Sequence, residues 1–241
     1  MTTSRTDRVA VVTITRPERR GALDLEHLED LDRQVHDAVR AGARALVVTG
    51  SDGHFCSGAD LTTLEDVSFA HRLAEVLTGL AAVPVTTVAA VDGACMGLGM
   101  QLALACDVRV VGDAARFAVP VARLGLMVDH WTLDRLARFW GEGAARHMVL
   151  TGEVLDAADA WRLGFAQVRG GLDDALALAG RAADLAPLTQ AGSKLGLGTA
   201  PSDAEAVSRY EAAFARAWQS EDLLEGRAAF AERRTPTFRG A

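Results

Sequence analysis

The chain is poor in the residues on which several classes of protein depend. It has 241 residues but only three cysteines, one tyrosine and a single lysine, Lys194. An odd cysteine count without a Cys-x-x-Cys pair indicates neither a disulfide framework nor a zinc site. We therefore expect Cys56, Cys95 and Cys106 to be small buried apolar residues. With one lysine, phosphate recognition has to rest mainly on the planar guanidinium of arginine.

Long apolar runs and an excess of positive charge are missing as well. No stretch approaches the ~20 residues that a membrane helix needs. The first eight residues lack the apolar core of a signal peptide, so we expect a cytoplasmic protein. The formal net charge of −7 disfavours a nucleic-acid partner. Apolar residues make up 49% of the chain, which is enough for a substantial core.

Residues 83–107 combine a strand pattern, a glycine turn and a helix pattern. The β-branched run 85–91 suits a buried strand, and residues 98–106, apolar on nearly all sides, suit a helix inside a core. Gly93, Gly97 and Gly99 lie between them or at the helix start and allow a ligand to approach the backbone closely. The first turn of such a helix has unpartnered N–H groups and the positive end of the helix dipole. This turn is therefore suited to hold a developing negative charge.

A second glycine element lies upstream and also follows an expected strand, residues 45–49. It reads Gly50-Ser-Asp-Gly-His-Phe-Cys-Ser-Gly58, and Ala59-Asp60-Leu61 comes next. Two backbone N–H donors, one from each glycine element, are what an oxyanion hole for a thioester carbonyl requires. A dinucleotide site is not indicated, because Leu102 occupies the place of the third glycine in that fingerprint.

The remaining patterns predict an α/β protein. Strands are expected at 9–14, 108–112, 116–119 and 167–168, and helices at 25–40 (with Asp24 as N-cap), 68–82, 131–140, 143–150 and 156–163, with a loop or short helix over 52–67. Such alternation predicts sheets covered by helices. From residue 172 no strand pattern remains, and Pro187 and Pro201 mark expected helix starts. We therefore divide the chain into a mixed region, 1–171, and a helical region, 172–241.

The whole pattern resembles the crotonase (enoyl-CoA hydratase/isomerase) superfamily. The resembling stretches are Arg16-Pro-Glu-Arg-Arg-Gly-Ala-Leu23, Phe55-Cys-Ser-Gly-Ala-Asp-Leu61, residues 91–107, 117–126 and 230–238, in the order and spacing of the family. The resemblance implies a spiral of ββα units that holds an acyl-CoA pocket. It also implies a C-terminal helical region that packs trimers, often paired as hexamers. The expected ligand is an acyl-CoA or enoyl-CoA, so coenzyme A is part of the ligand and no separate cofactor or metal is expected.

The resemblance also implies a set of site residues. The backbone N–H groups of Ala59 and Leu98 would form the oxyanion hole, although Leu98 stands where relatives often have glycine. Contacts with the acyl-CoA are implied for Arg20, Ala22, Leu23, Ala59, Asp60, Leu61, Thr62, Gly97, Leu98, Phe230 and Arg233. Phe230 and Arg233 match tail residues that can reach the CoA of a neighbouring subunit. For Arg20 and Arg233 the alternative is an ordinary solvated surface charge.

Two positions depart from the hydratase pattern. Family hydratases add water with two glutamates, and this chain has Gln101 and Val121 in their places. A carboxamide does not act as an acid or a base near neutral pH, and the valine side chain has no ionisable group. Water addition needs a base for the water and an acid for the adjacent carbon. Both degenerate catalytic positions therefore predict the loss of normal hydratase activity.

One carboxylate remains in this part of the pattern, that of Asp129. Dienoyl-CoA isomerases and aryl-CoA dehalogenases of the family place a catalytic aspartate at the matching position. A lone carboxylate in an apolar pocket could shuttle a proton within one substrate. The same carboxylate could instead only hold His130 or a backbone amide in place.

Three functional hypotheses follow. The first is an acyl-CoA-binding member of the superfamily, in fatty-acid metabolism, that has lost hydratase chemistry. The second is an enoyl-CoA isomerase-type enzyme with Asp129 as its sole acid and base. The third, a serine or cysteine hydrolase, is disfavoured because no Ser–His or Cys–His arrangement is evident.

Overall fold

The computed structural model describes residues 1–6, 8–62, 67–200 and 202–241. A six-stranded sheet runs through its centre, with the strand order β1-β2-β3-β4-β6-β9. The strands are β1 (Thr2–Thr6), β2 (Val9–Ile14), β3 (Ala45–Gly50), β4 (Thr86–Val91), β6 (Val108–Val111) and β9 (Val168–Arg169). From β2 to β9 every neighbouring pair is parallel, and only β1 pairs antiparallel, with β2.

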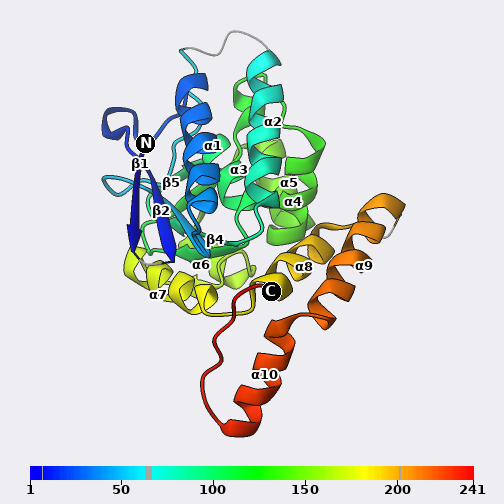
Figure 1. Ribbon diagram of the computed structural model, residues 1–241. Coiled ribbons are helices and arrows are strands. Elements are labelled where there is room, and N and C mark those ends of the chain that lie inside the picture. Colours follow the sequence, from blue (N-terminus) through cyan, green and yellow to red (C-terminus); the bar gives the residue numbers. More distant parts are fainter. Residues whose placement is uncertain (7, 63–66, 201) are drawn as a thin grey trace.

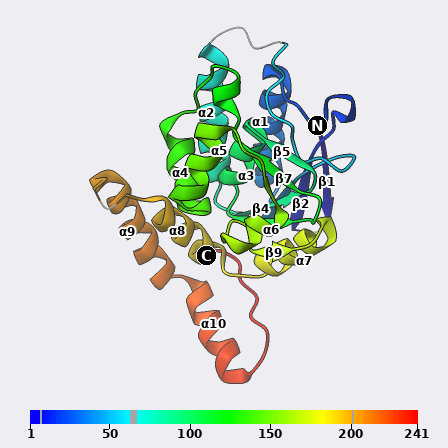
Figure 2. The same cartoon turned by 180° about the vertical axis from the view of Figure 1, so that it is seen from behind.

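Helices cover both faces of this sheet, as its nearly continuous apolar strands require. On one face lie α1 (Leu25–Arg40), α2 (Val67–Ala82) and α3 (Leu98–Ala105). On the other lies α7 (Leu172–Ala183), whose Ala175, Ala179 and Ala183 pack against alternate residues of β2, β3, β4 and β6 (Figures 1 and 2). Small side chains on α7 let the helix approach the sheet closely, so both faces of the sheet are buried.

A second, three-stranded sheet has the order β5-β7-β8, with β5 (Ala94–Met96), β7 (Arg116–Ala118) and β8 (Leu155–Asp156). The units β4-β5-α3 and β6-β7-α4, the latter ending in α4 (His130–Trp140), each place one strand in the large sheet and one in the small sheet. A bridge between Cys56 and Cys95 extends this layer to the segment that follows β3. The expected spiral of ββα units is therefore confirmed.

The remaining described elements are helices, some around the two sheets and three at the C-terminal end of the chain. Short helices η1 (Pro17–Arg19) and η2 (Val121–Arg123) precede α1 and α4, and α5 (Glu142–Thr151) and α6 (Ala157–Arg162) follow α4. Three further helices form the tail: α8 (Pro187–Gly198), α9 (Ala204–Trp218) and α10 (Glu221–Glu232). They lead away from the sheets, with α10 at the far end (Figure 1). None of the described helices is long and apolar enough to cross a bilayer.

The expected elements are found within one or two residues of their predicted bounds, and Asp24 caps α1 as expected. Three of the described strands, β1, β5 and β8, were not predicted. β1 is fully exposed and has no alternation of apolar and polar residues, while β5 has three residues and β8 only two, too few for a pattern. Between β4 and α3 the chain therefore forms a turn, the strand β5 and Gly97, where the sequence predicted a single glycine turn. Pro201 and the 63–66 part of the expected 52–67 loop lie outside the described residues. The helix α7 lies beyond residue 171 but packs on the sheet, and the two-region division stays a prediction.

Candidate functional site

Three chain segments that are far apart in sequence lie side by side next to the start of α3. The segment 16–24 meets the segment 56–62 through Leu23, whose N–H donates to the Gly58 carbonyl at 3.0 Å and whose carbonyl accepts from the Asp60 N–H at 2.8 Å. The 56–62 segment meets β5 in turn, because the Met96 N–H donates to the Cys56 carbonyl at 2.9 Å. The backbone therefore brings Leu23, Ala59 and the residues before Leu98 into one place.

Ala59 and Leu98 each follow a glycine with a positive φ angle. Gly58 has φ 121° and Gly97 has φ 50°, which residues with a side chain rarely adopt. The carbonyls of these glycines accept from Leu23 and Gln101, while the N–H of the residue that follows each glycine is left outside the local hydrogen-bond pattern. Within the described segments, neither the Ala59 nor the Leu98 N–H donates a hydrogen bond to protein. Both groups are thus available donors, and the Leu98 N–H also lies at the positive end of α3.

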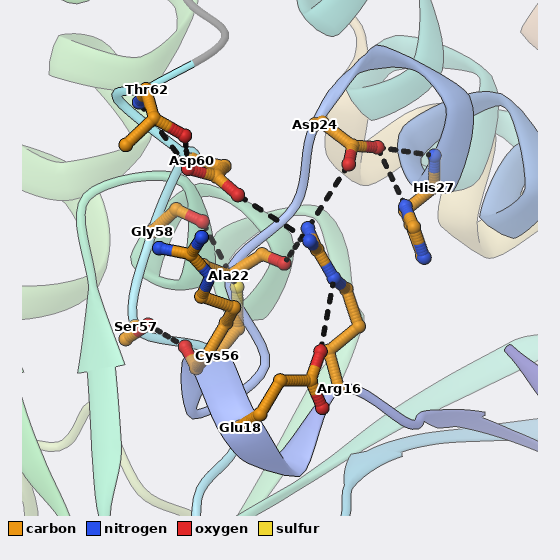
Figure 3. Close-up of polar contacts among 11 residues, drawn as sticks. Arg16, Glu18, Ala22, Asp24, His27, Cys56, Ser57, Gly58, Asp60 and Thr62 are labelled. Carbon is orange, nitrogen blue, oxygen red and sulfur yellow. Dashed lines mark hydrogen bonds and ion pairs between the residues drawn. The ribbon is translucent and has the colours of Figure 1, made fainter.

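An arginine that the sequence analysis did not assign to the site holds these segments together. Arg16 donates from Nη1 to the Ala22 carbonyl at 2.9 Å and pairs with Asp24 at 3.1 Å and with Asp60 at 3.4 Å (Figure 3). Its side chain is 14% exposed. Arg16 therefore links the turn before α1, the N-cap of α1 and the 56–62 segment. A sequence signal existed, since Arg16 stands in one of the resembling stretches.

Asp60 is held as a carboxylate within this cluster. Thr62 donates to Asp60 Oδ1 from its hydroxyl at 2.7 Å and from its N–H at 3.2 Å. The Thr62 hydroxyl, together with the charges of Arg19 and Arg16, holds the pKa of Asp60 below its usual value. The contacts orient the 59–62 backbone, while the Leu61 and Thr62 side chains face solvent. Of the expected CoA residues, Arg20 also faces solvent, and its carbonyl accepts from the Ser57 N–H at 3.0 Å.

Gln101 lies on α3, one turn after Leu98, and is buried. Its Nε2 donates to the Thr132 hydroxyl at 2.8 Å, and Thr132 is fully buried at the start of α4. The Thr132 N–H in turn donates to Asp129 Oδ1 at 3.1 Å, which makes Asp129 the N-cap of α4. Asp129 itself is exposed. The structure therefore connects Asp129 to Gln101 through one threonine, and it gives the Asp129 carboxylate a backbone-capping role. Val121 begins η2 and packs partly buried against the core.

The two tail residues of the expected CoA site lie elsewhere in the single chain. Phe230 is 88% exposed on α10, and Arg233 ends that helix in the left-handed conformation. A cavity of about 720 Å³ is bordered by Phe230 and lies among α8, α9, α10 and the C-terminal tail. One chain alone therefore does not bring α10 to the 56–62 segment (Figure 1).

The three cysteines are buried, as expected from their apolar contexts. Burial raises the pKa of both the Cys56 and the Cys106 thiols to about 12. Protonated, inaccessible thiols are poor nucleophiles. This leaves the cysteine hydrolase hypothesis without a nucleophile.

Comparison with known proteins matches the whole chain. The family model described as "Enoyl-CoA hydratase/isomerase" matches residues 4–241. The Mycobacterium tuberculosis protein named "Probable enoyl-CoA hydratase echA6" is 38% identical over 234 residues, covering 97% of this chain and 96% of the relative. The Escherichia coli 2,3-dehydroadipyl-CoA hydratase is 33% identical over 248 residues, covering 98% of this chain and 97% of the relative.

Solved structures agree with these sequence matches. Pseudomonas aeruginosa DspI has a TM-score of 0.89 and 30% identity, covering 99% of this chain and 96% of its own. An enoyl-CoA hydratase from Polaromonas sp. JS666 has a TM-score of 0.88 and 27% identity, covering 99% of each chain.

Proposed function

Because this chain belongs to the enoyl-CoA hydratase/isomerase family, we propose that it binds acyl-CoA thioesters through the N–H groups of Ala59 and Leu98 and lacks normal hydratase activity. The observation that carries the proposal is the pair of unpartnered amides, each behind a glycine with positive φ, on two segments joined by backbone hydrogen bonds. Preorganised N–H donors stabilise the charge that develops on a thioester oxygen. The family relatives named above are hydratases by name, which supports a CoA ester as the ligand class.

Gln101 and Val121 support the second half of the proposal. Gln101 is buried and its amide already donates to Thr132, so it offers no exchangeable proton and no base. Val121 is an apolar residue packed on the core. The protein would then act in fatty-acid metabolism by holding an acyl-CoA, in the cytosol, without adding water to it.

The remaining site residues would complete this pocket in an oligomer. Leu23, Asp60 and Thr62 order the 59–62 backbone. Arg20 and Leu61 are exposed, and the buried Ala22 accepts from Arg16 through its carbonyl. Phe230 and Arg233 would reach the CoA of a neighbouring subunit in a trimer or hexamer. No separate cofactor or metal enters this proposal.

Two measurements on the purified protein test the proposal. A CoA ester that binds only the native state raises the unfolding midpoint, and its dissociation constant can be measured by calorimetry. Crotonyl-CoA and longer enoyl-CoAs are then followed by loss of the conjugated thioester absorbance. We expect binding without turnover. Turnover above ~1 per second, ordinary for an enzyme, would overturn the loss of hydratase activity, and absence of any CoA-ester binding would overturn the site.

Two hydrogen bonds through Thr132 favour a second candidate, an isomerase that uses Asp129 alone. Asp129 is linked through Thr132 to Gln101, so a carboxylate stands two hydrogen bonds from the degenerate position. The Asp129→Asn variant should then lose isomerisation of 3-enoyl-CoA while keeping CoA-ester affinity. Full activity in Asp129→Asn, or no isomerisation by the wild type, removes this candidate.

A further inference from the structure

Two arginine side chains cap the carbonyl groups at the carboxyl end of α3. Arg109 of β6 is 2% exposed and donates from Nη1 to the carbonyl oxygens of Ala103 and Cys106 at 3.4 and 3.0 Å. Arg135 of α4 donates from Nε to the Leu104 carbonyl at 2.9 Å. These carbonyls belong to the last turn of a helix or follow it, and they have no partner inside the helix. Both guanidinium groups thus bind the negative end of the α3 dipole.

Aromatic rings alternate with these two guanidinium groups. Arg135 lies 4.7 Å from the Trp131 ring centre and 5.3 Å from that of Phe139. Arg109 lies 4.5 Å from the Phe139 ring and 5.0 Å from the Phe165 ring. The result is a ladder in the order Trp131, Arg135, Phe139, Arg109 and Phe165, which joins α4 to β6 beneath α3. Cation–π contacts of this kind strengthen when they are desolvated, so the ladder gives the carboxyl end of α3 a rigid support.

The charge of this ladder is directed at α3 and not at an acidic side chain. Over the described ranges neither Arg109 nor Arg135 forms an ion pair with a carboxylate, and the neighbouring Asp107 pairs with Lys194 at 2.8 Å. Burial lowers the pKa of Arg109 to about 10, so the group remains charged at neutral pH. An arginine buried without a carboxylate is costly, and no proton-transfer role in the proposed site uses it.

We propose that Arg109 and Arg135 are positioning residues that set the place of α3, and through it the place of the Leu98 N–H against the ligand carbonyl. The inference rests on the proposed function, since it concerns the same oxyanion hole. All eight residues of α3 are buried, so the helix is held by packing and by its two ends. Eight residues span only ~12 Å, and a short helix moves as a rod. A shift at the carboxyl end therefore reaches Leu98 at the other end.

The test separates positioning from general stability by comparing two ligands. Octanoyl-CoA has the thioester carbonyl, and its thioether analogue S-octyl-CoA lacks it, so the ratio of their dissociation constants reports the oxyanion hole alone. The variants are Arg135→Met, which keeps the unbranched apolar stem of the side chain but removes the guanidinium donors, and Arg109→Lys, which keeps the charge without the planar fork. The matched control is Arg138→Met, because Arg138 lies on the same helix, is exposed and pairs with Asp134 at 3.6 Å.

We expect the wild type and Arg138→Met to prefer the thioester equally, and Arg135→Met and Arg109→Lys to lose this preference by about tenfold, equivalent to ~1.4 kcal/mol. The affinity for S-octyl-CoA should change little in the folded variants, as checked by their circular dichroism. An unchanged ratio in both variants would overturn the positioning role. A wild type that binds both ligands equally, or neither, would instead overturn the proposed oxyanion hole, so the two failures are distinguishable.

Discussion

In the proposed function, Gln101 is a residue at which ligand binding would be kept while catalysis is lost. Its side chain occupies a buried place at the second turn of α3 and is tied to Thr132 at 2.8 Å. Replacing a carboxyl by a carboxamide keeps the shape and the capacity for a hydrogen bond but removes a group that can gain or lose a proton near neutral pH. The pocket can therefore keep its packing while it loses the acid and base that water addition needs.

Restoring both carboxylates should restore some hydration. In the double variant Gln101→Glu, Val121→Glu, we expect enoyl-CoA hydration to rise by about 10²-fold or more over the wild type, since one positioned acid or base contributes ~10²–10⁴-fold. Each single variant should stay near the wild-type rate, because water addition needs both groups. The rate is followed by loss of enoyl thioester absorbance. No gain in a folded double variant that still binds octanoyl-CoA would show that the missing glutamates are not what limits activity.

Arg16 should be required for both stability and ligand binding. In Arg16→Met, the Ala22 carbonyl and the carboxylates of Asp24 and Asp60 lose the donor that Arg16 provides. We therefore expect the free energy of unfolding, measured by urea titration, to fall by ~1.5–3 kcal/mol. Octanoyl-CoA affinity should fall as the 59–62 backbone loosens. Arg33→Met is the control, because Arg33 pairs with Asp30 at the surface and should change stability by under about 1 kcal/mol. Equal stability in the two variants would contradict the linking role of Arg16.

At the scale of elements, the carboxylates of Asp222 and Glu225 on α10 both hold the C-terminal tail, Asp222 by accepting from the N–H groups of Arg239 and Gly240. Glu225 accepts from both Nη1 and Nη2 of Arg234, at 2.6 and 2.8 Å, and from the Thr237 N–H at 2.8 Å. These bonds, with Arg234 the larger cause, lower the pKa of Glu225 from 4.5 to about 2. A folded-state pKa below the unfolded value stabilises the tail above about pH 4.5, and the stabilisation is lost as the pH falls toward 2.

The tail should therefore loosen over that acidic range in the wild type. We expect the hydrogen-exchange protection of the Thr237 N–H, corrected for intrinsic exchange, to fall between pH 4.5 and 2. In Glu225→Gln the protection should be low already at pH 7 and vary little with pH. The same protection in both proteins at pH 7 would show that Glu225 does not hold the tail.

At the scale of the whole molecule, the single chain leaves an apolar face open. Phe214 and Trp218 on α9 are 53% and 64% exposed, and they border the cavity of about 720 Å³ together with Phe230. Apolar surface of this kind marks a protein interaction site. The expected trimer or hexamer would cover it and would carry α10 to a neighbouring chain.

This arrangement predicts an oligomer that should dissociate when one charged residue is placed in its apolar interface. Light scattering should give three or six times the chain mass of 25.4 kDa for the wild type. Phe214→Glu should shift the mass toward the monomer and weaken octanoyl-CoA binding, if a neighbour supplies Phe230 and Arg233. The control Tyr210→Phe keeps the apolar face and should leave the mass unchanged. A monomeric wild type that binds octanoyl-CoA fully would contradict this prediction.

The sequence by itself determined most of the elements and the residue types at the expected site. Runs such as 85–91 and 98–106 consist mainly of apolar residues, so local pattern alone predicts a buried strand and a buried helix. Gln101 and Val121 predict the absence of the hydratase acid and base without coordinates, because acid–base capacity depends on the residue type. The paired glycines before Ala59 and Leu98 likewise predict unusual backbone turns.

Only the tertiary structure decided which of these residues meet. Asp60 is far from Arg16 and Asp24 along the chain, and it meets Arg16 because segments 16–24 and 56–62 pair through Leu23. The capping role of the Asp129 carboxylate, the arginine ladder beneath α3 and the packing of α7 on the sheet have the same origin. Contacts between distant segments depend on how the strands are ordered in space, which local pattern along the chain does not specify.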